Sequence, residues 1–115
     1  MTSRSAPAIG TGVRFFFYGT LLDPDMRRAV CGPAADGWRL VPAWIAGWRR
    51  GREPAYAYPF LVPAAAGIVE GIAAEMLDAG AAADLTLYEG EGYRTEQVAI
   101  RIAGAADDAW LFLPR

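Results

Sequence analysis

The sequence predicts an α+β domain in which about five strands form a curved or closed sheet and two short helices pack against it. Three observations support this fold class: a run of three phenylalanines near the start, a long alternating segment in the middle, and a strand–turn–strand pattern at the end. The chain has 115 residues, of which 54% are hydrophobic, so it is long enough for one domain with a sizeable core.

Composition excludes several classes of protein. The net charge of −2 gives no basic surplus, so we expect no nucleic-acid partner. Cys31 is the only cysteine, which rules out an intrachain disulfide, and the absence of histidine argues against a metal site and against a Ser-His or Cys-His pair. Residues 1–12 are expected to be a flexible leader without the apolar core of a signal peptide, and residues 13–115 to be the domain. With no apolar stretch long enough for a membrane span, we expect a cytoplasmic protein that contacts no membrane.

The N-terminal part of the domain predicts a strand followed by a helix. Residues 13–18 read V-R-F-F-F-Y, which is typical of a strand buried on both faces and ended by Gly19. Asp23 followed by Pro24 predicts an N-cap and the first helical position, and the helix should run to about Val30.

The middle of the chain predicts a long strand with an aromatic face. Residues 38–48 alternate, and Trp38, Trp44 and Trp48 fall on one side, where we expect them in the core or on a sheet face. Pro42 should lie at an edge or a bulge. The arginine-rich residues 49–54 are expected to form a solvated polar turn.

Two further segments precede the last third of the chain. Residues 58–63 contain two prolines and are expected to be extended. Residues 67–77 predict a strand in which Gly71 marks a bulge or a close approach of backbone, although a helix is an open alternative.

The last third predicts a helix and a hairpin. Asp78 can cap a helix whose buried face carries Ala81, Leu85 and Tyr88, and two glycines at 90 and 92 should end it. Residues 93–102 predict a strand, residues 104–108 a turn, and residues 110–113 the returning strand.

The first candidate site is the turn that follows the buried N-terminal strand. Its residues are Tyr18, Gly19, Thr20 and Leu21. Successive backbone N–H groups at such a turn can form an anion-binding nest, and glycine lets a ligand approach the backbone closely. A tight turn capped by threonine, without function, is the alternative on these residues alone.

The second candidate is Glu89, which lies in the segment Y-E-G-E-G-Y at the predicted end of a helix. The negative end of the helix dipole and partial burial both favour the protonated carboxyl, which could raise its pKa toward the range useful for proton transfer. The alternative is a pair of solvated glutamates, Glu89 and Glu91, in a glycine-rich turn. We expect Glu91 to be exposed in either case.

The order of these motifs resembles the γ-glutamylcyclotransferase-like family. The matching segments are residues 16–21 (F-F-Y-G-T-L), Gly47, residues 58–63 (Y-P-F-L-V-P), 68–77 and 85–94 (L-T-L-Y-E-G-E-G-Y-R), and the hairpin over 95–113. Y-G-T-L alone is a weak motif, but both site motifs in this order and at this separation are specific. The chain ends soon after its last predicted strand, as in the compact γ-glutamylamine cyclotransferase type.

The resemblance implies a fold and a reaction. The fold would be a small mixed β-barrel of about five to six strands with short helices at its rim. The reaction would be intramolecular aminolysis of a small γ-glutamyl amide or peptide, which releases 5-oxoproline and an amine without a cofactor. Glu89 would be the acid/base, residues 18–21 would bind the substrate, and Tyr18 and Tyr93 would line the pocket and donate hydrogen bonds.

Several points stay open on the sequence alone. Thr86 stands where the family usually has an aspartate, so we expect a changed local hydrogen bond and retained chemistry. The leaving group and the oligomeric state are not fixed by the sequence. The alternative function is a ligand-binding or scaffold module that keeps the cavity without turnover, although a retained Glu89 argues against it.

Overall fold

A computed structural model describes residues 13–51, 60–76 and 79–114. Within these ranges the strands are β1 (Val13–Phe17), β2 (Arg39–Gly51), β3 (Phe60–Met76), β4 (Tyr93–Ile102) and β5 (Ala105–Pro114). The helices are α1 (Pro24–Cys31) and α2 (Ala79–Glu89), with short 3₁₀ turns at Thr20–Leu22 and Pro33–Gly37. The expected leader, residues 1–12, lies outside the described residues.

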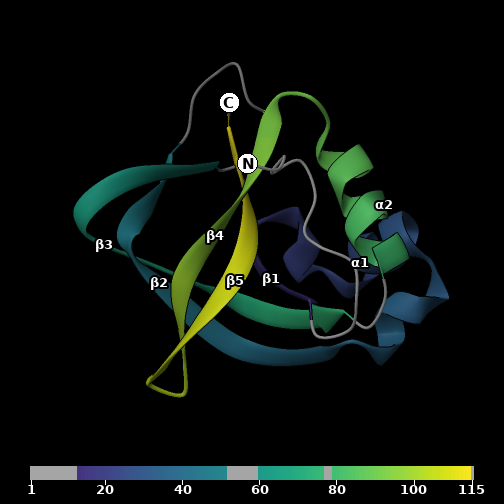
Figure 1. Cartoon of the computed structure of the whole chain (residues 1–115), viewed down its shortest axis with the longest axis horizontal. Coiled ribbons are helices and arrows are strands. Elements are labelled where there is room, and N and C mark those ends of the chain that lie inside the picture. Colours follow the sequence, from purple (N-terminus) through teal and green to yellow (C-terminus); the bar gives the residue numbers. More distant parts are fainter. Residues whose placement is uncertain (1–12, 52–59, 77–78, 115) are drawn as a thin grey trace.

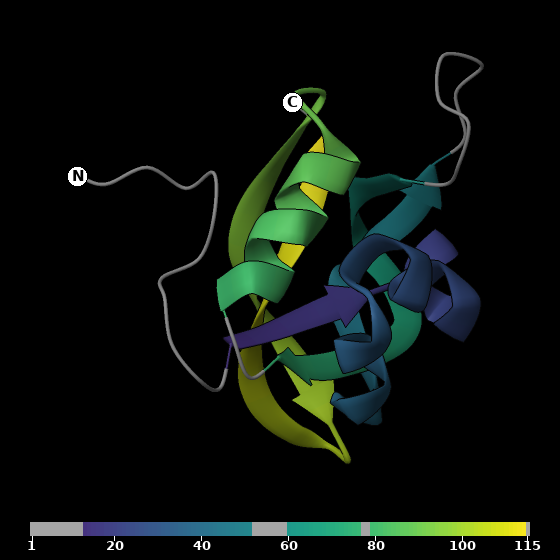
Figure 2. The ribbon, with the colours of Figure 1, turned by 90° about the vertical axis from the view of Figure 1, so that its right-hand side faces the viewer.

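The strands form a closed barrel in the order β1-β3-β2-β4-β5. β1 pairs with β5 in parallel and the other neighbours are antiparallel, so the sheet is mixed. Figure 1 shows the long β2–β3 pair curving around one side of the barrel, with the β4–β5 hairpin crossing it. In Figure 2 both helices lie on the same side of the sheet. The α+β class and the small mixed barrel are confirmed.

The phenylalanine run forms the interior strand that the sequence predicts. Phe15, Phe16 and Phe17 are all buried, and their strand β1 lies between β3 and β5. Phe16 packs inside the barrel, whereas Phe15 and Phe17 pack on the opposite face with the helices. Burial on both faces explains why the run shows no polar alternation. The helix after it begins as predicted, because the Asp23 side chain accepts a hydrogen bond from the Asp25 N–H.

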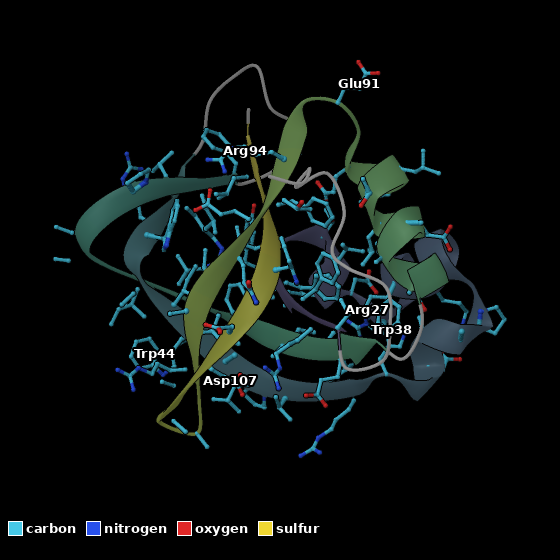
Figure 3. The ribbon with its side chains drawn as sticks, in the orientation of Figure 1. Arg27, Trp38, Trp44, Glu91, Arg94 and Asp107 are labelled. Carbon is cyan, nitrogen blue, oxygen red and sulfur yellow. The ribbon has the colours of Figure 1, made fainter. Side chains whose placement is uncertain are left out.

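The tryptophans lie in the core or on a sheet face, as predicted, but they do not share one side of the middle strand. In β2 the buried side chains are Ala43 and Ile45, on the face opposite Trp44, and Trp44 lies at the periphery of the molecule, far from Trp38 (Figure 3). Trp38 is buried with the helix-side cluster, and Trp48 packs against the barrel interior. The register shift between Ala46 and Trp48, at Gly47 with a φ of 90°, lets Trp48 change sides.

Two short predicted segments are in fact one long strand, β3. It joins the part of residues 58–63 that the structure describes to the predicted strand 67–77, so the helical alternative is excluded. Gly71 is a point of close approach as predicted, because a Cβ there would lie 2.2 Å from the Phe17 carbonyl oxygen. The predicted polar turn at 49–54 is also corrected, since residues 49–51 continue β2 and the others lie outside the described residues.

The C-terminal elements follow the prediction closely. α2 buries Ala81, Ala82 and Leu85 and ends at Gly90, which has a φ of 82°. Its expected cap, Asp78, lies outside the described residues. β4 has the predicted bounds, but the turn after it is shorter than expected. Only residues 103 and 104 lie between the strands, and both have positive φ. A two-residue turn with this geometry matches the twist of a β-hairpin.

Candidate active site

A small hollow lies at the end of β1, where the turn begins. Its volume is about 80 Å³. Its lining comes from β1, the following turn, the end of α2, and the strands β4 and β5: Phe16, Phe17, Tyr18, Gly19, Thr20, Leu21, Tyr88, Glu89, Tyr93 and Phe112. All six site residues predicted from the sequence therefore line one cavity, although about seventy residues of chain separate the two motifs.

The turn presents backbone donors. The carbonyls of Gly19 and Thr20 accept hydrogen bonds from the Leu22 and Asp23 N–H groups, at 3.0 and 3.1 Å. Within the part of the chain that the structure describes, the N–H groups of Gly19, Thr20 and Leu21 donate to no acceptor. They are the first N–H groups of a 3₁₀ turn, which have no partner inside the turn. They can therefore bind a carboxylate or a carbonyl oxygen.

Two arginines hold the carbonyl groups of this turn. Arg50, from β2, donates to the Tyr18 carbonyl oxygen from Nε at 3.2 Å and from Nη2 at 3.0 Å, and Nη2 also donates to the Glu70 carbonyl at 2.8 Å. Arg27, only 7% exposed in α1, donates to the Leu21 carbonyl at 2.7 Å. The sequence predicts a solvated arginine run at residues 49–54 and gives Arg50 no role at the site. This role could not be predicted, because the acceptors of Arg50 are backbone carbonyls distant in sequence.

Glu89 is the last residue of α2 and is partly buried. Burial raises the pKa of its carboxyl to about 7, because the surrounding protein solvates the carboxylate less well than water does. A carboxyl with this pKa exchanges protons readily near neutral pH. Glu91 is exposed, as predicted, and Figure 3 shows its carboxylate pointing outward from the loop between α2 and β4.

Tyrosine side chains connect the turn to the rest of the pocket. The Tyr18 hydroxyl donates to the Phe112 carbonyl at 3.0 Å, so the expected hydrogen bond from Tyr18 to a substrate is not available in this conformation. Burial, and next the nearby negative charge of Glu89, raises the pKa of the Tyr18 phenol, which therefore stays neutral. Thr20 Oγ1 and the Tyr88 hydroxyl are 3.3 Å apart, which joins the turn to the helix that carries Glu89.

Sequence reasoning did not single out Tyr88 or Phe112 as lining residues. Tyr88 was assigned only to the packing face of its helix, although its position next to Glu89 was a usable signal. Phe112 had no such signal, since its place depends on the pairing of β1 with β5. The expected change of local hydrogen bonding at Thr86 is a bond from its hydroxyl to the Ala82 carbonyl, at 2.9 Å within α2.

Among the described residues, no three His, Cys, Asp or Glu side chains gather in a way that could hold a metal ion. Neither helix in this part of the chain has the length and apolar character needed to cross a membrane.

Comparison with known proteins gives a family. A family model described as γ-glutamyl cyclotransferase, AIG2-like, matches residues 15–115. No curated protein matches the chain at a significant level.

Solved structures share the fold at low sequence identity. An Arabidopsis thaliana protein is 23% identical with a TM-score of 0.75, over 89% of this chain and 68% of its own. A second Arabidopsis thaliana protein is 20% identical with a TM-score of 0.76, over 99% and 66%. A γ-glutamyl cyclotransferase is 13% identical with a TM-score of 0.73, over 90% and 67%. The chain thus spans about two thirds of the length of each of these proteins, and the likeness shows the fold.

Proposed function

Because this chain belongs to the AIG2-like γ-glutamyl cyclotransferase family, we propose that it converts a γ-glutamyl amide into 5-oxoproline and a free amine. One observation carries the proposal: Glu89, whose carboxyl has a pKa of about 7, lines the same small hollow as three backbone N–H groups without acceptors among the described residues. A proton carrier and a set of donors are what an acyl transfer to an amine requires.

In the proposed reaction the substrate's own α-amino group is the nucleophile. The Glu89 carboxylate takes a proton from the α-ammonium group, and the freed amine attacks the γ-carbonyl carbon. The new C–N bond closes a five-membered ring. The protonated Glu89 then gives its proton to the amide nitrogen as the old C–N bond breaks. Overall two protons pass from the attacking nitrogen to the leaving nitrogen, and Glu89 can carry them one at a time.

The turn would position the substrate and stabilise the charge that develops on it. Nucleophile and carbonyl belong to one molecule, so the enzyme needs to hold the bent conformer in which they meet. N–H groups of Gly19, Thr20 and Leu21 would bind the substrate carboxylate or the oxygen of the reacting carbonyl. Tyr93 would complete the wall of the pocket on the side of β4.

A turnover screen tests this proposal. We expect the protein to release 5-oxoproline and amine in equal amounts from at least one member of a panel of γ-glutamyl amides with different leaving amines. If ligands from the panel bind but none releases 5-oxoproline, the chain is a binding module on the same fold.

Arg50 gives a second testable consequence, because it fixes the peptide group between Tyr18 and Gly19. No peptide bond among the described residues is cis, so the Gly19 N–H lies on the edge of that peptide opposite the carbonyl that Arg50 holds. We expect Arg50→Gln to lower kcat/KM about tenfold, because a misplaced Gly19 N–H stabilises the transition state less well. Arg50→Lys should restore only part of it, because an ammonium cannot make the parallel pair of bonds.

Arg49→Gln is the matched control. Arg49 is the neighbouring exposed arginine. It donates a long 3.5 Å hydrogen bond to the Arg50 carbonyl, and it is not among the residues that line the hollow. Steady-state kinetics well below the melting temperature of each variant separate positioning from folding. Equal activity of the Arg49 and Arg50 variants would show that the hydrogen bonds from Arg50 to the Tyr18 carbonyl have no role in the reaction.

A further inference from the structure

A second hollow lies beside the candidate active site. It has a volume of about 380 Å³ and is bounded by the C-terminal half of α2, the start of β4 and the end of β5. Figure 2 shows α2 lying alongside these strands. The two hollows share Tyr93 and Phe112, so these two side chains border both of them.

The surface of the second hollow is mainly apolar. Leu87, on α2, is 80% exposed at its edge. The hydroxyls of the two threonines in the lining do not face the hollow. Thr86 donates its hydroxyl to the Ala82 carbonyl, and Thr95 is only 2% exposed with its Oγ1 buried. Glu91, the charged side chain in the described lining, is solvent-exposed. A ligand here would meet aliphatic and aromatic atoms.

The sizes of the two hollows suggest that they bind different parts of one substrate. The active-site hollow, at about 80 Å³, is well below the roughly 300 Å³ at which pockets for whole small molecules begin. It suits the polar end of a substrate, where the chemistry occurs. The second hollow, at about 380 Å³, lies within the range of ligand pockets.

We propose that the second hollow binds the leaving amine, and that the preferred substrates are γ-glutamyl amides of amines with an apolar stem. This inference rests on the proposed cyclotransferase function and gives it a substrate class. The amide nitrogen lies at Glu89, so the group attached to it leaves the small hollow past Tyr93 and Phe112 and reaches the apolar surface. Leu87 packs on that group, which accounts for a large aliphatic side chain left in water.

The test is a series of γ-glutamyl n-alkylamides from methyl to pentyl. We expect kcat/KM to rise about threefold to fourfold per methylene that becomes buried. Leu87→Gln keeps the size and helix preference of the side chain but removes its apolar character, so it should reduce the pentyl-to-methyl ratio at least threefold. Ile68→Thr is the matched control, because Ile68 is 62% exposed on β3 and lines neither hollow, and this variant should keep the wild-type ratio.

A wild-type kcat/KM that does not depend on alkyl length would overturn the inference, and so would a Leu87→Gln enzyme with an unchanged ratio. Binding of n-pentylamine, followed by the NMR shifts of the Leu87 methyl groups, gives a readout without turnover. If the methylamide is cyclised but chain length has no effect, the proposed function stands and the amine site fails. If pentylamine binds at Leu87 but no γ-glutamyl amide is cyclised, the hollow binds apolar amines and the cyclotransferase function fails.

Discussion

Glu89→Gln is expected to lower kcat for a γ-glutamyl amide by roughly 10²-fold or more, with little change in substrate binding. Glutamine keeps the shape of the side chain and removes the group that carries the proton. The remaining donors of the turn still bind the substrate, so KM should change far less than kcat. The measurement is steady-state release of 5-oxoproline at neutral pH.

Asp84→Asn is the control for this experiment. Asp84 is exposed on the same helix, α2, and is not among the residues that line either hollow, so its substitution removes one negative charge without touching the site. We expect its kcat to stay within about twofold of wild type, as for most surface changes. A general electrostatic effect would lower both variants alike, and equal losses would contradict the assignment of Glu89.

Glu89→Gln should also become more stable than the wild type as the pH rises. A carboxyl whose folded pKa is raised from 4.5 to about 7 favours the folded state fully below pH 4.5, and this advantage is lost as the pH rises through 7. Between pH 4.5 and about 7 the unfolded chain has released the proton that the folded chain still holds, so the wild type loses stability over this range. Glu89→Gln cannot titrate and escapes this loss, which we put at about 2 kcal/mol given partial exposure.

Urea unfolding of both proteins at pH 5 and pH 8 measures this effect. The free energy of unfolding of Glu89→Gln minus that of wild type should be about 2 kcal/mol larger at pH 8 than at pH 5. The difference between the two pH values cancels any constant effect of the amide on packing. A difference that does not grow with pH would mean that the folded carboxyl titrates at its ordinary pKa.

The parts of the fold that were predictable depend on local signals. The β1 strand, the Asp23 cap and the end of α2 at Gly90 each follow from a few adjacent residues, and each lies where the sequence places it. The prediction that Trp48 shares a side of β2 with Trp44 was wrong, because alternation places side chains correctly only while the register is unbroken. The residue that reverses the pattern, Gly47, acts through a register shift against β3, which is a non-local event.

The candidate site divides in the same way. Its two motifs were visible because each combines glycine with polar residues at an element boundary, and barrel closure brings both to one hollow. Arg50 and Phe112 were not predictable, because each reaches the site through the pairing of strands far apart in sequence. The Arg50 side chain donates a hydrogen bond to the Tyr18 carbonyl, 32 residues away in sequence. The Phe112 carbonyl accepts a hydrogen bond from the Tyr18 hydroxyl, 94 residues away in sequence.

The most direct measurement of the central claim, that Glu89 is the proton carrier of a cyclotransferase, is the dependence of kcat/KM on pH for 5-oxoproline release. Because Glu89 must be ionised to accept a proton from the substrate, we predict that kcat/KM rises with pH through an apparent pKa of about 7. The residual activity of Glu89→Gln should lack this rise. A wild-type profile that rises near pH 4.5, or a rise near 7 that survives in Glu89→Gln, would contradict the assignment.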